Sequence, residues 1–174
     1  TAMIPRKVLL LDADSDHLDA LSSLLKREGF EVITGRTGEV GLVIASTEKP
    51  DIIVANLVMP EMDGFQLYRT LRSPSYHEFS AIPFLFLSPG SAATQRLNAF
   101  HMDSIAYPLD ESARRHFVAV VRKMLSLEEI KRTIANYLNI EDEVDNDNQE
   151  QDIFIFQEYS GRQQGMGRPV SETP

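Results

Sequence analysis

Five short apolar stretches alternate with segments of helical periodicity along the first 125 residues of the chain. The first of them, KVLLL, is apolar at consecutive positions, which is typical of a strand buried on both faces of a parallel sheet. They lie at residues 7–11, 30–34, 52–55, 82–88 and 104–106. Because short connections join strand to helix five times, the pattern predicts an α/β domain with a doubly wound parallel sheet and helices on both faces.

The segments between the strands carry apolar residues three and four positions apart, which gives each predicted helix one apolar face. The first helix is introduced by Asp14 or Ser15 as a capping residue. The helix after the third strand begins at Asp63, and Gln66 three residues later completes a capping-box pattern. The last helix of this domain, which we place at residues 1–125, is expected over residues 112–125.

A sixth helix is predicted beyond the domain, over residues 126–140, because Ser126 and Glu129 fit a second capping box. Its apolar stripe has to pack against the domain, against a second copy of the chain or against a partner. The stripe consists of Leu127, Ile130, Ile134 and Leu138. Residues 141–174 are interpreted as an acidic linker and a flexible tail, which fits the start of a longer output domain.

The charge of the chain is unevenly distributed. The net charge is −9, and seven acidic residues without a basic one lie between Glu141 and Asp152, which leaves about −2 on the remaining residues. A nucleic-acid-binding surface is therefore not expected. The last helix of the domain has a basic edge, for which three explanations are open. The edge is solvated, it contacts an acidic partner, or it contacts the chain's own acidic linker. The edge consists of Arg114, Arg115, Arg122 and Lys123.

Composition narrows the class of protein further. The chain has 174 residues, of which 43% are hydrophobic and 25% charged, as in an ordinary globular domain. Cysteine is absent, which excludes a disulfide scaffold and a thiolate metal site. No apolar run approaches membrane-spanning length, so we expect a cytoplasmic protein without a membrane partner.

Polar residues follow the first and third predicted strands. A doubly wound order places the carboxyl ends of these strands side by side, so Asp12, Asp14 and Asn56 are expected in one crevice. Asp14 is better explained as a helix cap than as a metal ligand. The four histidines lack metal-ligand spacing and are expected at the surface. They are His17, His77, His101 and His116.

Residues 7–125 resemble a response regulator receiver domain. The motifs that carry the resemblance are Asp12 after the first strand, Met59-Pro60 with Asp63-Gly64 after the third, Ser88 closing the fourth and Tyr107-Pro108 after the fifth. The resemblance implies a flavodoxin-like sheet with strand order 2-1-3-4-5. In that family two adjacent acids bind Mg²⁺ together with an acceptor aspartate. A Thr or Ser and a Lys before a Pro contact the phosphoryl oxygens.

The departures from the family pattern fall on the residues that carry its chemistry. Asn56 stands in the place of the phosphoacceptor aspartate, Ala13 in the place of the second acid, and Tyr107 in the place of the lysine before Pro108. Ser104 falls where the family often has an aromatic residue that reports phosphorylation. Of the groups that contact the phosphoryl oxygens, Ser88 alone keeps its residue type. We therefore interpret four residues as switch-like in position only: Ser88, Ser104, Tyr107 and Pro108.

The remaining groups are too few for phosphotransfer. A neutral amide is a poor nucleophile, and no catalytic residue and no enzymatic activity are expected. Mg²⁺ usually requires one or two carboxylates in near-octahedral geometry. With Ala13 and Asn56 in place of two acids, we expect no cofactor and at most weak Mg²⁺ binding through Asp12 and Asp14.

These expectations favour a pseudo-receiver: a phosphorylation-independent signalling module in a two-component-like regulatory system. The alternative is a receiver that is phosphorylated at another acceptor, such as Ser88 or Asp14, and controls an output domain beyond this sequence. The expected partner is another signalling protein or a second copy of the chain. The resemblance places this contact on the fifth strand and its flanking helices, residues 91–125.

Overall fold

A computed structural model describes residues 6–107 and 109–138 of the chain. All five strands are parallel, and the predicted order β2-β1-β3-β4-β5 is confirmed. The strands are β1 Lys7–Leu11, β2 Glu31–Gly35, β3 Ile52–Asn56, β4 Phe84–Pro89 and β5 Ser104–Tyr107. β1 is paired on both sides, with β2 and with β3, so the residues after β1 and β3 leave the sheet next to each other.

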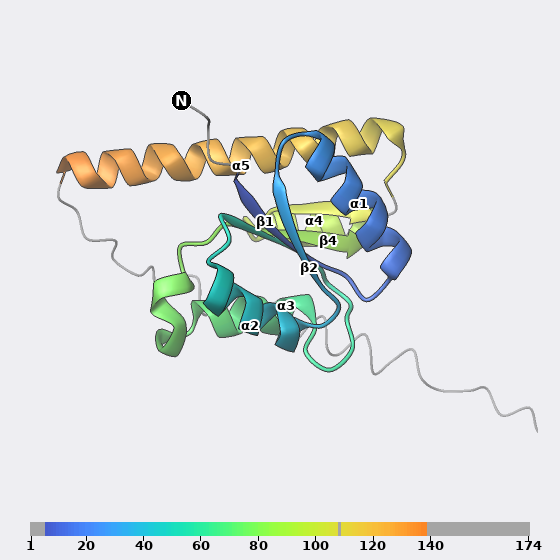
Figure 1. The fold of residues 1–174 in the computed structure, drawn as a ribbon, viewed down its shortest axis with the longest axis horizontal. Helices are drawn as coiled ribbons and strands as arrows, with labels where there is room; N and C mark the ends of the chain where they lie inside the picture. The colour runs from blue at the N-terminus through green and yellow to red at the C-terminus, as the bar shows by residue number, and fades with distance from the viewer. Residues whose placement is uncertain (1–5, 108, 139–174) are drawn as a thin grey trace, which may run out of the picture. The chain divides into compact units, whose positions relative to one another are not determined.

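Helices cover both faces of this sheet, as predicted. α1 and α5 lie on one face, and α2 and α3 lie on the other (Figure 1). A short 3-10 helix, η1, follows α3 and was not predicted. The helices are α1 Ser15–Arg27, α2 Gly38–Glu48, α3 Gly64–Arg72, η1 Pro74–Phe79, α4 Ser91–Ala99 and α5 Glu111–Leu138.

Alternation along each strand divides the core into two layers. Val8 and Leu10 of β1 belong to the cluster that contains the apolar faces of α1 and α5. Leu9 and Leu11, which alternate with them, are also fully buried and point to the opposite face. This two-sided burial explains why residues 8–11 of β1, 52–55 of β3 and 84–87 of β4 are apolar at every position. Each fully buried side chain of this kind stabilises the fold by roughly 1.5–3 kcal/mol.

Local capping sets the start of the helices that border the crevice. Asp14 accepts hydrogen bonds from the backbone N–H groups of Asp16 and His17, so it caps α1 as predicted. The capping box of α3 is also present, with Asp63 and Gln66 bonded reciprocally. Both caps satisfy backbone donors that the first helical turn leaves without a partner.

The predicted separate helix over residues 126–140 is wrong, because α5 continues without a break from Glu111 to Leu138. The Ser126 hydroxyl donates to the Arg122 carbonyl one turn earlier (2.9 Å) and so is compatible with a helix interior. Glu129 pairs with Arg6 instead of closing a capping box.

The extended part of α5 leaves its apolar stripe in solvent. Leu127, Ile130 and Ile134 are 47%, 54% and 53% exposed. Packing against the domain, one of the three fates expected for this stripe, is therefore not observed for these three residues.

Some expectations fall outside the described residues. These are the acidic linker and tail at residues 141–174, the end of the predicted sixth helix, and Pro108. Within residues 6–107 and 109–138, none of the helices has both the length and the apolar character needed to cross a membrane.

Candidate functional site

The crevice forms where β1 and β3 end. Leu11 and Ala55 are partners in the parallel register, so the residues that follow them, Asp12 and Asn56, lie side by side at the carboxyl ends of the two strands. The Asp12 backbone N–H donates to the carbonyl of Gly35 in β2 (3.2 Å), and Asp12 is only 2% exposed. The sheet therefore holds a buried carboxylate beside the amide of Asn56, as the sequence predicts.

Three donors surround the Asp12 carboxylate. Oδ1 accepts from the backbone N–H of Asp14 (3.0 Å), and Oδ2 accepts from Asn56 Nδ2 (3.2 Å). His17 Nδ1 also lies 3.2 Å from Oδ2. Since an ionised carboxylate only accepts hydrogen bonds, this ring nitrogen is the donor. A buried carboxylate is costly unless it is hydrogen-bonded, and these three contacts supply hydrogen bonds to both of its oxygens.

The Asn56 amide is held at both ends. Its Oδ1 accepts from the backbone N–H of Val58 (3.0 Å), and its Nδ2 donates to Asp12. Behind it, α3 begins so close that a Cβ atom on Gly64 would lie 2.3 Å from the Asn56 carbonyl oxygen. Only glycine fits this approach, which explains Gly64 at the start of the helix.

The other two residues of the acidic pocket, Ala13 and Asp14, make hydrogen bonds that involve the backbone. Ala13 has no ligand group, and its carbonyl accepts two hydrogen bonds from the Arg36 guanidinium, through Nε (3.1 Å) and Nη2 (2.7 Å). One carboxylate oxygen of Asp14 caps α1, and the other lies 3.6 Å from His17 Nε2.

These residues do not fit Mg²⁺. The ion needs oxygen ligands with free lone pairs. N–H donors occupy both oxygens of Asp12, the NH₂ group of Asn56 faces the same carboxylate, and Ala13 contributes nothing. Among the residues that the structure describes, no group of three or more His, Asp or Glu side chains is arranged to hold a metal ion.

The switch-like serines both contact α4. Ser88, which is fully buried at the end of β4, has its Oγ 2.6 Å from Thr94 Oγ1 and donates to the Ile105 carbonyl (3.3 Å). The Ser104 hydroxyl lies within hydrogen-bond distance of the Thr94 carbonyl (3.2 Å) and of Asn98 Oδ1 (3.1 Å). These contacts join α4 to both β4 and β5. Tyr107 is the last residue of β5, opposite Pro89.

Two residues of the crevice were missed by the sequence reasoning. His17 was expected at the surface, yet its ring contacts Asp12 and Asp14. Its place in the first turn of α1 is a usable signal, because a side chain three residues after the N-cap points back toward it. Arg36 follows β2 directly, and the parallel order brings it to the same edge of the sheet as Ala13.

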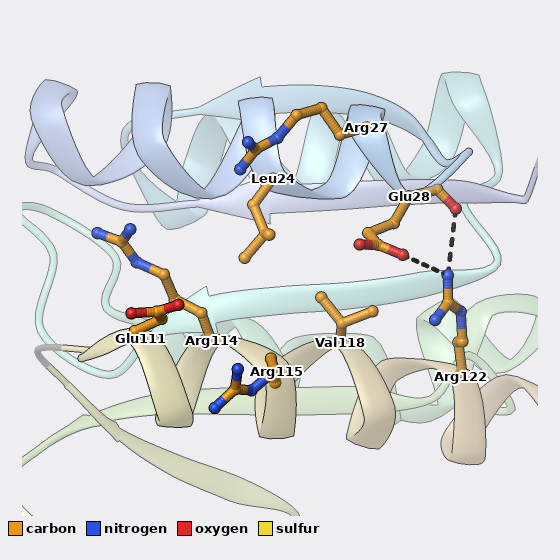
Figure 2. A pocket seen from close by; sticks show the side chains of 8 residues that line it. All are labelled: Leu24, Arg27, Glu28, Glu111, Arg114, Arg115, Val118 and Arg122. Carbon is orange, nitrogen blue, oxygen red and sulfur yellow. Dashed lines mark hydrogen bonds and ion pairs between the residues drawn. The ribbon is translucent and has the colours of Figure 1, made fainter.

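A second hollow lies between α1 and α5, with a volume of about 480 Å³. Figure 2 shows Leu24 of α1 and Val118 of α5 pointing into it from opposite sides. Its remaining lining is charged and consists of Arg27, Glu28, Glu111, Arg114, Arg115 and Arg122. Arg122 donates to the Glu28 carboxylate (2.7 Å) and to the Glu28 carbonyl (3.4 Å), as the dashed lines show.

Residues 8–134 match the family model for the response regulator receiver domain. The chain belongs to this family. The receiver domain is a signalling domain of two-component response regulators. Among curated relatives, PilH of Pseudomonas aeruginosa is 29% identical over 108 residues, which cover 60% of this chain and 88% of PilH.

Other relatives of this receiver are longer than the chain. PhoP, the alkaline phosphatase synthesis transcriptional regulatory protein of Bacillus subtilis, is 29% identical over 125 residues, 72% of this chain and 50% of PhoP. Protein RcaC of Microchaete diplosiphon is 37% identical over 97 residues, 56% of this chain and 15% of RcaC. The chain therefore spans half or less of the length of these two relatives.

Solved structures agree on the fold. The chemotaxis response regulator CheY4 of Vibrio cholerae aligns with a TM-score of 0.59 at 23% identity, covering 70% of this chain and 99% of CheY4. A CheY-like receiver domain protein of Methanospirillum hungatei aligns with a TM-score of 0.60 at 21% identity, covering 74% of this chain and 99% of that protein.

Proposed function

We propose that this receiver domain is a phosphorylation-independent signalling module that acts through protein–protein contacts in a two-component-like system of the cytoplasm. One observation carries the proposal: at the acceptor position, Asn56 presents an NH₂ donor to Asp12 instead of a carboxylate to a phosphodonor. An acyl phosphate requires an anionic oxygen nucleophile, which this position lacks.

The other acceptors that we considered are engaged elsewhere. Ser88 is fully buried, and its hydroxyl contacts Thr94 and the Ile105 carbonyl. Asp14 uses one carboxylate oxygen to cap α1. Phosphorylation at either residue would break contacts that hold α4 or begin α1, so neither supports the alternative of a receiver with a displaced acceptor.

We place the partner surface on α4, β5 and the adjoining part of α5, residues 91–125. The hydroxyls of Ser88 and Ser104 join α4 to β4 and β5, which favours one fixed arrangement of this surface. β5 is an edge strand of the sheet. A surface that is held in this way supports constitutive binding of a signalling protein or of a second copy.

The charge beside this surface indicates the chemistry of a partner. Arg114 and Arg115 of α5, together with Arg27 of α1, line a groove whose apolar walls are Leu24 and Val118 (Figure 2). An acidic segment with an apolar side chain complements such a groove, since guanidinium groups pair well with carboxylates.

Intact-mass spectrometry after incubation with acetyl phosphate and Mg²⁺ tests the proposed function. We expect no phosphoryl adduct on the wild-type chain. The Asn56→Asp and Ala13→Asp/Asn56→Asp variants, measured in parallel, show whether the scaffold regains reactivity when carboxylates return. A stoichiometric adduct on the wild type would refute the proposal, and loss of that adduct in Ser88→Ala or Asp14→Ala would then identify the acceptor.

A further inference from the structure

We infer that His17 closes the acidic pocket against metal ions, so that its imidazole N–H, and not a cation, satisfies the Asp12 carboxylate. The inference rests on the proposed function, because it explains how a receiver pocket without Mg²⁺ keeps a buried carboxylate. It assigns a positioning role to a residue that belongs to none of the family's motif positions in this sequence.

The argument begins with the acceptor capacity of Asp12. Each carboxylate oxygen has about two positions at which it accepts a hydrogen bond or a metal ion. At Oδ2 both positions are used, by Asn56 Nδ2 and by His17 Nδ1, each at 3.2 Å. At Oδ1 one position is used, by the Asp14 N–H. Because Asp12 is only 2% exposed, water has little access to the acceptor position that remains on Oδ1.

The position of His17 places its ring in the way of a metal ion that would bind Asp12 and Asp14 together. Its ring lies between the two carboxylates that the sequence offers as metal ligands, with Nδ1 3.2 Å from Asp12 Oδ2 and Nε2 3.6 Å from Asp14 Oδ2. An ion that binds both carboxylates has to displace the ring. If the ring stayed, its N–H dipole would point its positive end toward the ion.

A consequence follows for any attempt to rebuild the metal site. Returning carboxylates at positions 13 and 56 adds ligands but leaves the ring on Asp12. We therefore expect that the two acids alone restore metal binding poorly, and that removal of His17 is needed for the full gain.

The experiment measures free Mn²⁺ by electron paramagnetic resonance during titration with MnCl₂, at one pH and one ionic strength. The full chain is compared as Ala13→Asp/Asn56→Asp and as Ala13→Asp/His17→Ala/Asn56→Asp. We expect the dissociation constant to fall by at least about tenfold when His17 is removed. His116→Ala in the double-variant background is the matched control, since His116 is an exposed histidine of α5, and it should leave the affinity unchanged.

Equal affinities with and without His17, or the same gain from His116→Ala, would overturn the inference. Circular dichroism verifies that each variant is folded. If the double variant does not fold, Asn56→Asp with and without His17→Ala replaces the pair, and the same comparison decides. These outcomes are independent of the proposed function, which fails only if the wild type itself takes up a phosphoryl group.

Discussion

Replacing Asn56 by aspartate should destabilise this receiver even though it restores the family's acceptor residue. In the wild type, Asn56 Nδ2 donates to Asp12 Oδ2 at 3.2 Å. The substitution puts an oxygen in the place of this nitrogen, so two carboxylates face each other at about the same distance, and Asp12 is buried.

The size of the effect follows from this geometry. At an effective dielectric constant near 20, two unit charges 3.2 Å apart repel by about 5 kcal/mol. The protein avoids part of this cost when the introduced carboxyl takes up a proton, which at pH 7 costs about 4 kcal/mol for a group that normally titrates near 3.9. We expect a loss of about 2–4 kcal/mol in the free energy of unfolding at pH 7.

The pH dependence separates charge repulsion from loss of a hydrogen bond. The pKa of the introduced carboxyl is raised in the native state, so the native state holds its proton more tightly than the unfolded state does. The penalty is therefore small near pH 4 and grows, by at most about 1.4 kcal/mol per pH unit, as the pH rises toward that pKa. Asn56→Ala removes the hydrogen bond without adding a charge, and its penalty should not follow this trend.

Urea denaturation monitored by circular dichroism between pH 4.5 and 8 provides the measurement for the wild type, Asn56→Asp and Asn56→Ala. A penalty of Asn56→Asp that stays below about 1 kcal/mol and does not change with pH would refute the contact between Asn56 and Asp12, since a second carboxylate beside the buried Asp12 cannot be neutral in cost.

Two further substitutions test the start of α3. Asp63→Ala removes the N-cap and should cost about 1 kcal/mol in urea denaturation, whereas Asp63→Asn keeps the cap. Because burial raises the pKa of Asp63, an effect that the hydrogen bond from the Gln66 N–H partly offsets, the charged form is disfavoured in the native state. Asp63→Asn should therefore be at least as stable as the wild type at pH 7, with an advantage that shrinks toward pH 4. Gly64→Ala should lower the free energy of unfolding by more than about 2 kcal/mol, since its Cβ would lie 2.3 Å from the Asn56 carbonyl oxygen and the backbone would have to move.

The sheet was predictable because burial on two sides leaves a simple signal. β1 and β3 are apolar at consecutive positions, and the alternation with helices predicts parallel strands. The order in which their ends meet came from the doubly wound arrangement that the family resemblance implies. The same reasoning predicts Asp12 and Asn56 in one crevice, and they lie in hydrogen-bond contact there. These predictions depend on backbone topology alone, to which the hydrophobic pattern contributes the strands and the family resemblance their order.

The end of the last helix was not predictable from the same signals. A serine followed three residues later by a glutamate occurs at helix starts, but Ser126 bonds to a carbonyl in the preceding turn and Glu129 pairs with Arg6 from the other end of the chain. His17 was missed for a similar reason. Its contact with Asp12 depends on the direction of one side chain in the first turn of α1, which spacing between histidines does not report.

The departures of this chain from the receiver pattern compensate one another. Asn56 supplies a donor to the carboxylate that a metal ion would otherwise neutralise, His17 supplies a second, and Arg36 holds the Ala13 carbonyl beside them. Replacing Asn56 by aspartate therefore removes a donor and adds a charge in the same step. In such a hydrogen-bond network, the cost of a restored carboxylate at position 56 is set by the partners that it leaves unsatisfied.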